Sequence, residues 1–265
     1  MEKTEAQQAD FWSCNPCGAD GDLIKVITQR YRIDSWLPLE LQTIPTDRGK
    51  YLEVGCGQGV DGFYICGRLI KECEYTAIDF STESVKRAAE FIDAAKEAFD
   101  IQVIPKFLWG DAMDLDFGDD EFDFIYSMGA IHHTPDPQKA IDEIHRVLKI
   151  GGQAKIFLYR RYSLKVGIAK ILRGIQFIGD KLFFTDRFIY KFIRQRKSKV
   201  FGSMFLECFG VPWMEWFSDK ALRAMFKDFE SVNIEPYGFN IPKLWNNEVS
   251  GYNVFGHFHR IDVIK

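Results

Sequence analysis

The chain has 265 residues, of which 46% are hydrophobic and 27% are charged. These fractions are typical of a globular protein and exclude a disordered chain, and no apolar run approaches the roughly 20 residues that a membrane-spanning helix needs. The first ten residues lack the basic-then-apolar pattern of a signal peptide, and the six cysteines show no disulfide spacing. We therefore expect reduced thiols and a cytoplasmic protein.

Short apolar runs alternate with helix-period segments between residues 50 and 160. This alternation predicts parallel βαβ units and a doubly wound α/β sheet. Helices are predicted over 22–37, over 82–99, and from an N-cap at Asp136 with Pro137 at the first position to Gly151-Gly152. The predicted strands are 51–54, 75–78, 103–108, 122–127, 153–159, 231–236 and 254–264.

Residues 160–217 interrupt this alternation. Leu164, Ile168, Ile171, Ile175 and Ile178 recur at helical spacing. The segment from 160 to 200 holds twelve basic and two acidic residues, a net charge of +10 in a chain whose total is −4. We interpret 160–217 as a helical cap whose apolar face turns inward over a binding pocket. Contact with an anionic membrane or with an acidic acceptor or carrier protein stays open, whereas nucleic acid is not expected of an acidic chain.

A glycine-rich turn, Glu53-Val54-Gly55-Cys56-Gly57-Gln58-Gly59, follows the first predicted strand. Glycines let the backbone approach a ligand closely, because no Cβ intervenes. The NAD fingerprint would need glycine at position 60, where Val60 stands. The Glu53 carboxylate would repel a pyrophosphate but suit an ammonium group. The alternative is a tight connection without a ligand.

Acidic residues end the next two strands as well. Asp79 comes 24 residues after Gly55, where a carboxylate can accept hydrogen bonds from both hydroxyls of a ribose. Phe80 beside it can stack on adenine, and Asp111 at the end of the third strand can accept the adenine amine. Together with Glu53, these acids indicate a nucleoside that carries positive charge, as a sulfonium does.

These motifs resemble those of class I S-adenosylmethionine-dependent methyltransferases, in the methyltransferase type 11 or quinone-biosynthesis-like branch. The first three family motifs look like Glu53-x-Gly55-x-Gly57-x-Gly59, Ile78-Asp79 and Gly110-Asp111-Ala112, and the branch motifs look like Ala130-Ile131-His132-His133 and residues 143–152. One departure is Ile150, where the family usually has proline.

The resemblance implies a Rossmann-like, seven-stranded sheet whose last strand is antiparallel. It implies S-adenosylmethionine as the cofactor and no metal. The implied cofactor-binding residues are Glu53, Gly55, Cys56, Gly57, Gly59, Asp79, Phe80, Asp111, Ala112, Ser127 and Met128.

We divide the chain into an N-terminal helical segment, 1–49, covering the cofactor site, and a methyltransferase domain, 50–265, that carries the cap. The predicted reaction is in-line methylation of oxygen or nitrogen on a small hydrophobic or aromatic acceptor. The alternatives are a cyclisation or elimination that uses the same cofactor, and a binding module without catalysis. A monomer and a homodimer are both compatible with the sequence.

Two histidines follow the fourth strand, at the edge of the expected cleft. A neutral imidazole can take a proton from the acceptor, so we predict His133 as the base and His132 as the second candidate. The alternative is that one anchors the loop and the other lines the pocket. The predicted acceptor contacts are Tyr31, Tyr159 and Trp213, with core packing as the equal alternative for Tyr31 and as the favoured alternative for Trp213. The lone pair Cys14 and Cys17 supplies too few ligands for a structural metal site.

Overall fold

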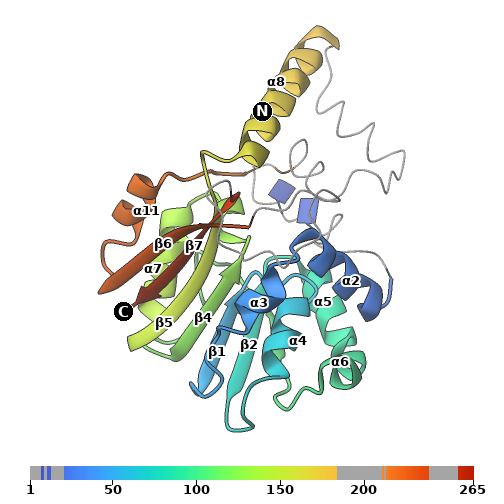
Figure 1. Ribbon diagram of the computed structural model, residues 1–265, viewed down its shortest axis with the longest axis vertical. Coiled ribbons are helices and arrows are strands. Elements are labelled where there is room, and N and C mark those ends of the chain that lie inside the picture. Colours follow the sequence, from blue (N-terminus) through green and yellow to red (C-terminus); the bar gives the residue numbers. More distant parts are fainter. Residues whose placement is uncertain (1–6, 9–10, 13–20, 184–210, 212, 239–255) are drawn as a thin grey trace.

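The computed structural model describes residues 7–8, 11–12, 21–183, 211, 213–238 and 256–265. Their strands are β1 (Lys50–Val54), β2 (Glu74–Asp79), β3 (Lys106–Trp109), β4 (Phe122–Met128), β5 (Leu148–Tyr159), β6 (Ser231–Tyr237) and β7 (Phe258–Ile264). They form one seven-stranded sheet in the order β3-β2-β1-β4-β5-β7-β6 (Figure 1). The first five strands are parallel, and β7 runs antiparallel between β5 and β6. The predicted doubly wound sheet with an antiparallel last strand is confirmed.

Helices connect the strands, and some of them begin or end at other residues than predicted. The described helices are α2 (Leu23–Ile33), α3 (Leu37–Leu41), α4 (Val60–Cys66), α5 (Thr82–Glu90), α6 (Ile92–Phe99), the 3₁₀ helix η1 (Ile131–His133), α7 (Pro137–Val147), α8 (Leu164–Phe183) and α11 (Asp219–Met225). The single helix predicted over 82–99 is two, because Phe91 caps both α5 and α6 while it packs on the core.

The bounds of two other helices differ from the prediction. The helix expected over 22–37 ends at Ile33, because the backbone leaves the helical conformation at Asp34, and α3 begins at Leu37 with Pro38 in its first turn. Helix α7 begins at the predicted Asp136 cap but ends at Val147, before Gly151-Gly152. The reason is that Leu148 turns into extended backbone and pairs with β4, which places the two glycines inside β5.

The helices cover both faces of the sheet (Figure 1). Side chains alternate along a strand, so β1 sends Tyr51 to one face and Leu52 to the other. Tyr51 belongs to a buried cluster with Leu37 of α3 and Phe63 of α4. Leu52 belongs to a second cluster with Ile144 of α7. The core is thus two apolar layers, one on each face, that hold the strand ends in fixed positions.

Helix α8 forms within the predicted insertion and extends away from the sheet (Figure 1). The prediction that its apolar face turns inward is wrong for Ile171, Ile175 and Ile178, each of which is more than half exposed. In the part of the chain that the structure describes, no helix has the length and apolarity to cross a membrane. The predicted helical continuation beyond α8 lies outside the described residues.

The strand order reverses between β1 and β4, because the chain runs outward to β3 on one side and to β5 on the other. In open α/β sheets, ligands bind at such a point, outside the carboxyl ends of the strands. The residues after Val54 and after Met128 therefore meet at this edge.

Candidate functional site

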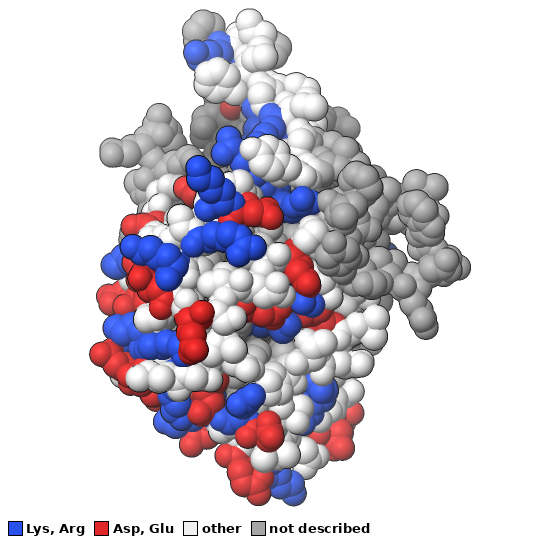
Figure 2. All heavy atoms as spheres, turned by 60° about the vertical axis from the view of Figure 1, so that its left-hand side comes forward, with Lys and Arg blue, Asp and Glu red and all other residues white. Residues whose placement is uncertain are grey.

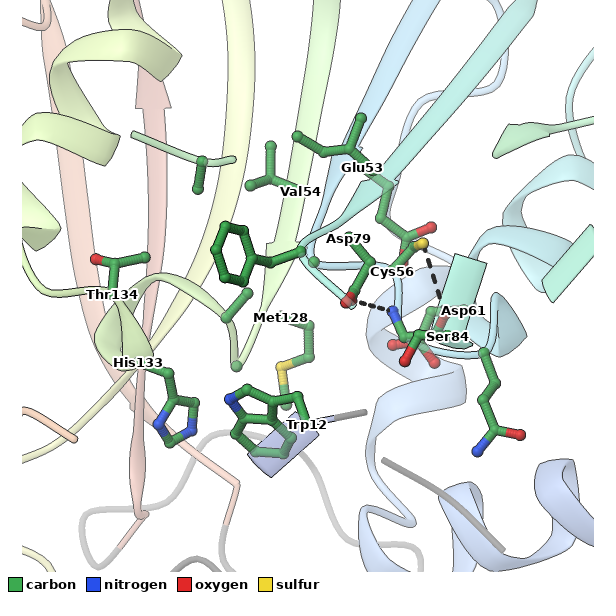
Figure 3. A pocket seen from close by; sticks show the side chains of 18 of the residues that line it. Trp12, Glu53, Val54, Cys56, Asp61, Asp79, Ser84, Met128, His133 and Thr134 are labelled. Atoms are coloured by element: carbon green, nitrogen blue, oxygen red, sulfur yellow. Dashed lines mark hydrogen bonds between the residues drawn. The ribbon is translucent and has the colours of Figure 1, made fainter. Parts of the chain in front are cut away.

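A cavity lies at this edge, between the carboxyl ends of the central strands and the N-terminal segment (Figure 3). On one side are Glu53, Cys56 and Asp79, and on the other are Trp12 and His133 (Figure 3). Most of the predicted site residues line it, namely Glu53, Gly55, Cys56, Gly57, Asp79, Phe80, Asp111, Ala112, Met128, His133, Tyr159 and Trp213.

The glycine-rich turn bends the backbone tightly between β1 and α4. Gly55, Gly57 and Gly59 have φ values of 84°, 53° and 80°, in the left-handed region that favours glycine. A Cβ on Gly55 would collide with Ala130, and one on Gly59 would lie 2.7 Å from the Phe107 ring. The turn therefore requires these glycines, and it exposes backbone to the cavity.

Asp79 ends β2 beside this turn. Its Oδ2 accepts a hydrogen bond of 2.8 Å from the Gly57 N–H, and its Oδ1 accepts one of 2.8 Å from the Ser81 N–H. Burial raises the pKa of Asp79, while these two donors oppose the shift. The carboxylate is thus held rigidly at the strand end, facing the cavity.

Asp111 is fixed in a similar way after β3. Its Oδ1 accepts a hydrogen bond of 2.9 Å from the Met113 N–H, and the side chain lines the same cavity. Phe80, which follows Asp79 in the chain, also lines the cavity, and its ring centre lies 5.9 Å from that of Trp109. A flat ring and two carboxyl groups along one wall match the predicted adenosine site.

Glu53, the last residue but one of β1, is buried beneath the turn. The Tyr75 hydroxyl donates to its Oε2 at 2.9 Å. Burial, with the Asp61 carboxylate adding to it, raises the pKa of Glu53 to about 8. The side chain therefore holds a proton at neutral pH in the ligand-free protein, and it would release that proton to solvent when a cation binds beside it and stabilises the carboxylate.

Arg30 of α2 is a site residue that the sequence reasoning missed. Its guanidinium contacts Asp61 at 2.7 Å and Asp34 at 3.3 Å, and all three line the cavity. The prediction chose its neighbour Tyr31, but successive residues of a helix face directions about 100° apart, and only Arg30 turns inward. The i, i+4 pair of Arg30 with Asp34 was the available signal.

The charge of the lining favours a cationic ligand. The described residues around the cavity include five carboxyl groups and one guanidinium, that of Arg30. The carboxyl groups belong to Asp34, Glu53, Asp61, Asp79 and Asp111. The residues present thus fit a nucleoside that bears an ammonium and a sulfonium group. The guanidinium of Arg30 suits a carboxylate on the same ligand.

His133 occupies the opposite side of the cavity, at the end of η1. Its Nδ1 lies 3.0 Å from the Trp213 carbonyl oxygen. A carbonyl can only accept, so Nδ1 carries the proton and the neutral ring keeps its basic lone pair on Nε2. The Trp12 ring packs edge-on against the imidazole, with the ring centres 5.0 Å apart.

Gln8 joins the segments around His133, and nothing in the sequence pointed to it. Its buried amide donates to the His133 carbonyl oxygen at 2.8 Å and accepts from the Trp213 N–H at 3.3 Å. One side chain thereby satisfies two backbone groups that are far apart in the chain. It also lines the cavity together with Trp12.

Four predicted residues lie outside the lining of this cavity. The Tyr31 ring faces Tyr64 of α4, which favours the core-packing alternative. His132 is fully buried, with its ring 3.9 Å from that of Tyr159. Ser127 donates to the Val54 carbonyl oxygen at 2.9 Å, and so ties β4 to β1. Gly59 forms the N-cap of α4 instead.

Cys56 is buried in the turn. Burial, followed by the carboxylates of Asp79 and Glu53, raises the pKa of its thiol well above the ordinary value. It is therefore a poor nucleophile and serves as a small side chain that fits the turn. Among the described residues, no cluster of His, Cys, Asp and Glu could hold a metal ion. Cys14 and Cys17 lie outside those residues.

Comparisons with known proteins agree with this geometry. Residues 52–156 match the family model of a methyltransferase domain. The chain is 32% identical over 133 residues to an Arabidopsis thaliana tocopherol O-methyltransferase, with 50% of this chain and 36% of that protein covered. It is 28% identical to the demethylmenaquinone methyltransferase of Staphylococcus carnosus, with 60% and 65% covered.

A solved structure shares the fold along almost the whole chain. It is a SAM-dependent methyltransferase of Thermotoga maritima, described as a possible histamine N-methyltransferase, with a TM-score of 0.62 and 18% identity. The alignment covers 97% of this chain and 99% of that one. The chain spans between a third and a half of the length of the first curated relatives. Residues 52–156 therefore form a methyltransferase domain of the kind that this family model describes, and the chain as a whole has the fold of a SAM-dependent methyltransferase.

Proposed function

We propose that this protein transfers the methyl group of S-adenosylmethionine to oxygen or nitrogen of a small hydrophobic or aromatic acceptor. The observation that carries the proposal is one cavity with two unlike sides. The acidic side, with Glu53, Asp79 and Asp111, suits a cationic nucleoside. The aromatic side places the basic nitrogen of His133 across the same space.

Each acidic residue takes a distinct part of the donor in this proposal. Asp79 accepts hydrogen bonds from the ribose hydroxyls, Asp111 accepts one from the adenine amine, and Glu53 accepts one from the ammonium group. Arg30 binds the carboxylate of the methionine part. S-adenosylmethionine supplies an electrophilic methyl group on a positively charged sulfur. The remaining proposed cofactor contacts come from backbone and side chains along the turn and after β3 and β4, namely Gly55, Cys56, Gly57, Phe80, Ala112 and Met128.

His133 acts as the general base in the proposed reaction. With S-adenosylmethionine bound, the acceptor oxygen or nitrogen would bond to the methyl carbon as the carbon–sulfur bond broke and left its electron pair on sulfur. The acceptor proton moves to Nε2 of His133. The Trp213 carbonyl stabilises the imidazolium that results, because it already accepts a hydrogen bond from Nδ1. His132 is buried behind Tyr159 and takes no direct part.

The chemistry of the lining defines the acceptor class. Trp12, Tyr159, Trp213 and Phe258 supply aromatic walls on the side of His133. Such walls favour a flat or apolar acceptor by stacking and by burial of apolar area. The relatives named for tocopherol and demethylmenaquinone support the same class, because each of these molecules joins a ring to an apolar chain.

We further propose that residues 1–49 cover the cofactor site. Six of their described side chains line the cavity: Gln8, Trp12, Val26, Arg30, Ile33 and Asp34. Within 160–217, Trp213 is the one described residue that lines the cavity. The proposed cap is therefore limited to the end of this segment that holds Trp213. We propose the cytoplasm as the compartment, since Cys56, Cys66 and Cys73 are free thiols.

The nature of the products tests the proposed reaction. The protein is incubated with S-adenosylmethionine and a panel of quinols, phenols and amines, and the products are identified by mass. We expect S-adenosylhomocysteine together with an acceptor heavier by one methylene. Methylthioadenosine without a methylated product would instead support a cyclisation or elimination. Failure of calorimetry to detect binding of S-adenosylmethionine and S-adenosylhomocysteine would refute the proposal altogether.

A further inference from the structure

One face of α8 carries a stripe of exposed apolar side chains. Ile171, Ile175, Ile178 and Leu182 follow each other at intervals of four, three and four residues, so they fall on one side of the helix. Their exposed fractions are 66%, 52%, 59% and 68%. Single exposed apolar residues are ordinary, but a continuous stripe of this kind marks a surface that contacts another apolar phase.

Cationic side chains accompany this stripe. At 100° per residue, Lys170 and Lys181 of α8 lie on one flank of the stripe, whereas Arg173 and Asp180 lie on the opposite side of the helix. The Lys170 ammonium lies over the Trp216 ring and that of Lys181 over the Phe177 ring, so both cations sit against apolar surface. Figure 2 shows Lys and Arg side chains in the upper part of the molecule, where α8 stands. An apolar stripe with cations beside it complements an anionic bilayer. The acyl chains accommodate the apolar side chains, and the anionic headgroups attract the cations.

The first half of α8 adjoins the aromatic side of the cavity. The helix follows β5, whose last residue, Tyr159, lines the cavity. Arg173 donates to the Val211 carbonyl oxygen at 3.2 Å, two residues before Trp213. Leu172 and Trp216 pack against the same core cluster. A surface that held α8 would therefore lie beside the proposed acceptor side and away from the proposed donor side.

We propose that α8 rests on the surface of an anionic lipid bilayer through the stripe Ile171, Ile175, Ile178 and Leu182. The contact itself follows from the helix alone. Its consequence, that the protein draws a lipid-soluble acceptor from the bilayer into the aromatic side of the cavity, rests on the proposed function. The acyl region of the bilayer buries the apolar stripe that the described fold leaves exposed, and its anionic headgroups attract the neighbouring cations.

Flotation of the full chain with vesicles tests the contact. One set contains phosphatidylcholine and phosphatidylglycerol, and the other contains phosphatidylcholine alone. We expect binding to the anionic vesicles that weakens as salt is raised. The double variant Ile171→Ser, Ile178→Ser should lower the partition coefficient about tenfold, because two side chains no longer enter the apolar layer. Lys181→Gln should reduce binding to the anionic vesicles by a few-fold.

The matched control is the double variant Ile24→Ser, Ile150→Ser. It removes two isoleucines that are 62% and 84% exposed outside α8, and it should bind vesicles as the unchanged protein does. Absence of binding to anionic vesicles, or equal losses in both double variants, would overturn the proposal. A dimer in sedimentation velocity that the α8 variant abolishes, without vesicle binding, would assign the stripe to a second copy of the chain instead.

Calorimetry with S-adenosylmethionine separates this inference from the proposed function. Both double variants should retain the affinity of the unchanged protein, because none of the four substituted residues lines the cavity. A protein that binds the donor but no vesicle refutes only the bilayer contact. A protein that binds vesicles but no donor refutes only the proposed methyl transfer.

Discussion

The two sides of the cavity are built in different ways. On the acidic side, Glu53, Asp79 and Asp111 each lie at or just after the carboxyl end of a neighbouring strand, within one stretch of about sixty residues. On the aromatic side, the Gln8 amide connects His133 and Trp213 across sequence separations of 125 and 205 residues. The sheet ladder fixes the whole of the first side. On the second side it fixes Tyr159 and Phe258, while side-chain contacts hold His133 and Trp213.

This difference has a consequence for function. The positions of the acidic groups change only if the sheet changes, so the donor site is constrained by the whole fold. The aromatic side can be altered by single substitutions in loops, which is how one fold accommodates many substrates. Variants on the aromatic side should thus impair the reaction and spare donor binding, while variants on the acidic side should impair donor binding itself.

The largest effect is expected from His133→Asn. The asparagine amide can still donate to the Trp213 carbonyl, but it cannot take a proton. We expect the turnover number for a hydroxyl-bearing acceptor to fall by about 10²–10³, with unchanged affinity for S-adenosylmethionine. His145→Asn on α7, outside the cavity, is the control. Turnover that stays at the level of the unchanged protein would remove His133 from the role of base.

Asp79→Ala should have the next largest effect, and on binding. It deletes the acceptor of the proposed ribose hydrogen bonds and leaves the Gly57 and Ser81 N–H groups without that partner. We expect the dissociation constants of S-adenosylmethionine and S-adenosylhomocysteine to rise by about a hundredfold in calorimetry. Asp116→Ala, on the exposed loop between β3 and β4, should bind normally. Equal affinity in the two variants would contradict the ribose assignment.

Glu53→Gln should weaken S-adenosylmethionine binding by about tenfold and remove its pH dependence. The ammonium group favours the ionised carboxyl, whose pKa is about 8 in the ligand-free protein, so affinity should increase from pH 6 to pH 8. In the glutamine variant the affinity should be flat over this range. A parallel pH dependence in both proteins would assign the titration to another group.

The raised pKa of Glu53 should also make the stability of the ligand-free protein depend on pH. The folded pKa of Glu53 lies above its unfolded value of 4.5, so the folded state holds a proton that the unfolded state has lost. The free energy of unfolding should therefore keep its full value below pH 4.5 and decline by about 1–3 kcal/mol as pH rises toward 8. Urea unfolding of the ligand-free glutamine variant should lack this decline.

The smallest effect on donor binding is expected from Gln8→Ala. The substitution leaves the His133 carbonyl and the Trp213 N–H without their buried partner, which should lower the free energy of unfolding by about 1–2 kcal/mol. The affinity for S-adenosylmethionine should stay within about twofold, while turnover falls. Thermal unfolding and calorimetry check both parts. A large loss of donor affinity would mean that the two sides of the cavity are coupled.

Much of the fold could be predicted because strands and helices leave local patterns. Apolar runs located all seven strands, five of them within the alternation over 50–160, although β3 begins three residues later and β5 five residues earlier than predicted. Asp136 with Pro137 marked the start of α7. The misplaced ends reflect packing that no local pattern encodes. Phe91 divides one predicted helix in two, and Leu148 leaves α7 early because it pairs with Phe122 of β4.

The site divides in the same way. Glycines with positive φ and acids at strand ends are local features, so the sequence pointed to Gly55, Gly57, Asp79 and Asp111. It also pointed to His133, but it gave no means of ranking it by geometry above His132, which the fold buries against Tyr159.

By itself, the sequence determined the parallel sheet and the acidic, glycine-rich side of the cavity, because a strand, its turn and its last carboxylate are neighbours in the chain. Only the tertiary structure decided that Arg30 and not Tyr31 faces the cavity, that Gln8 holds His133 to Trp213, and that the apolar stripe of α8 faces outward. These features depend on contacts between segments far apart in sequence, and the free energy of such contacts is set by packing in three dimensions.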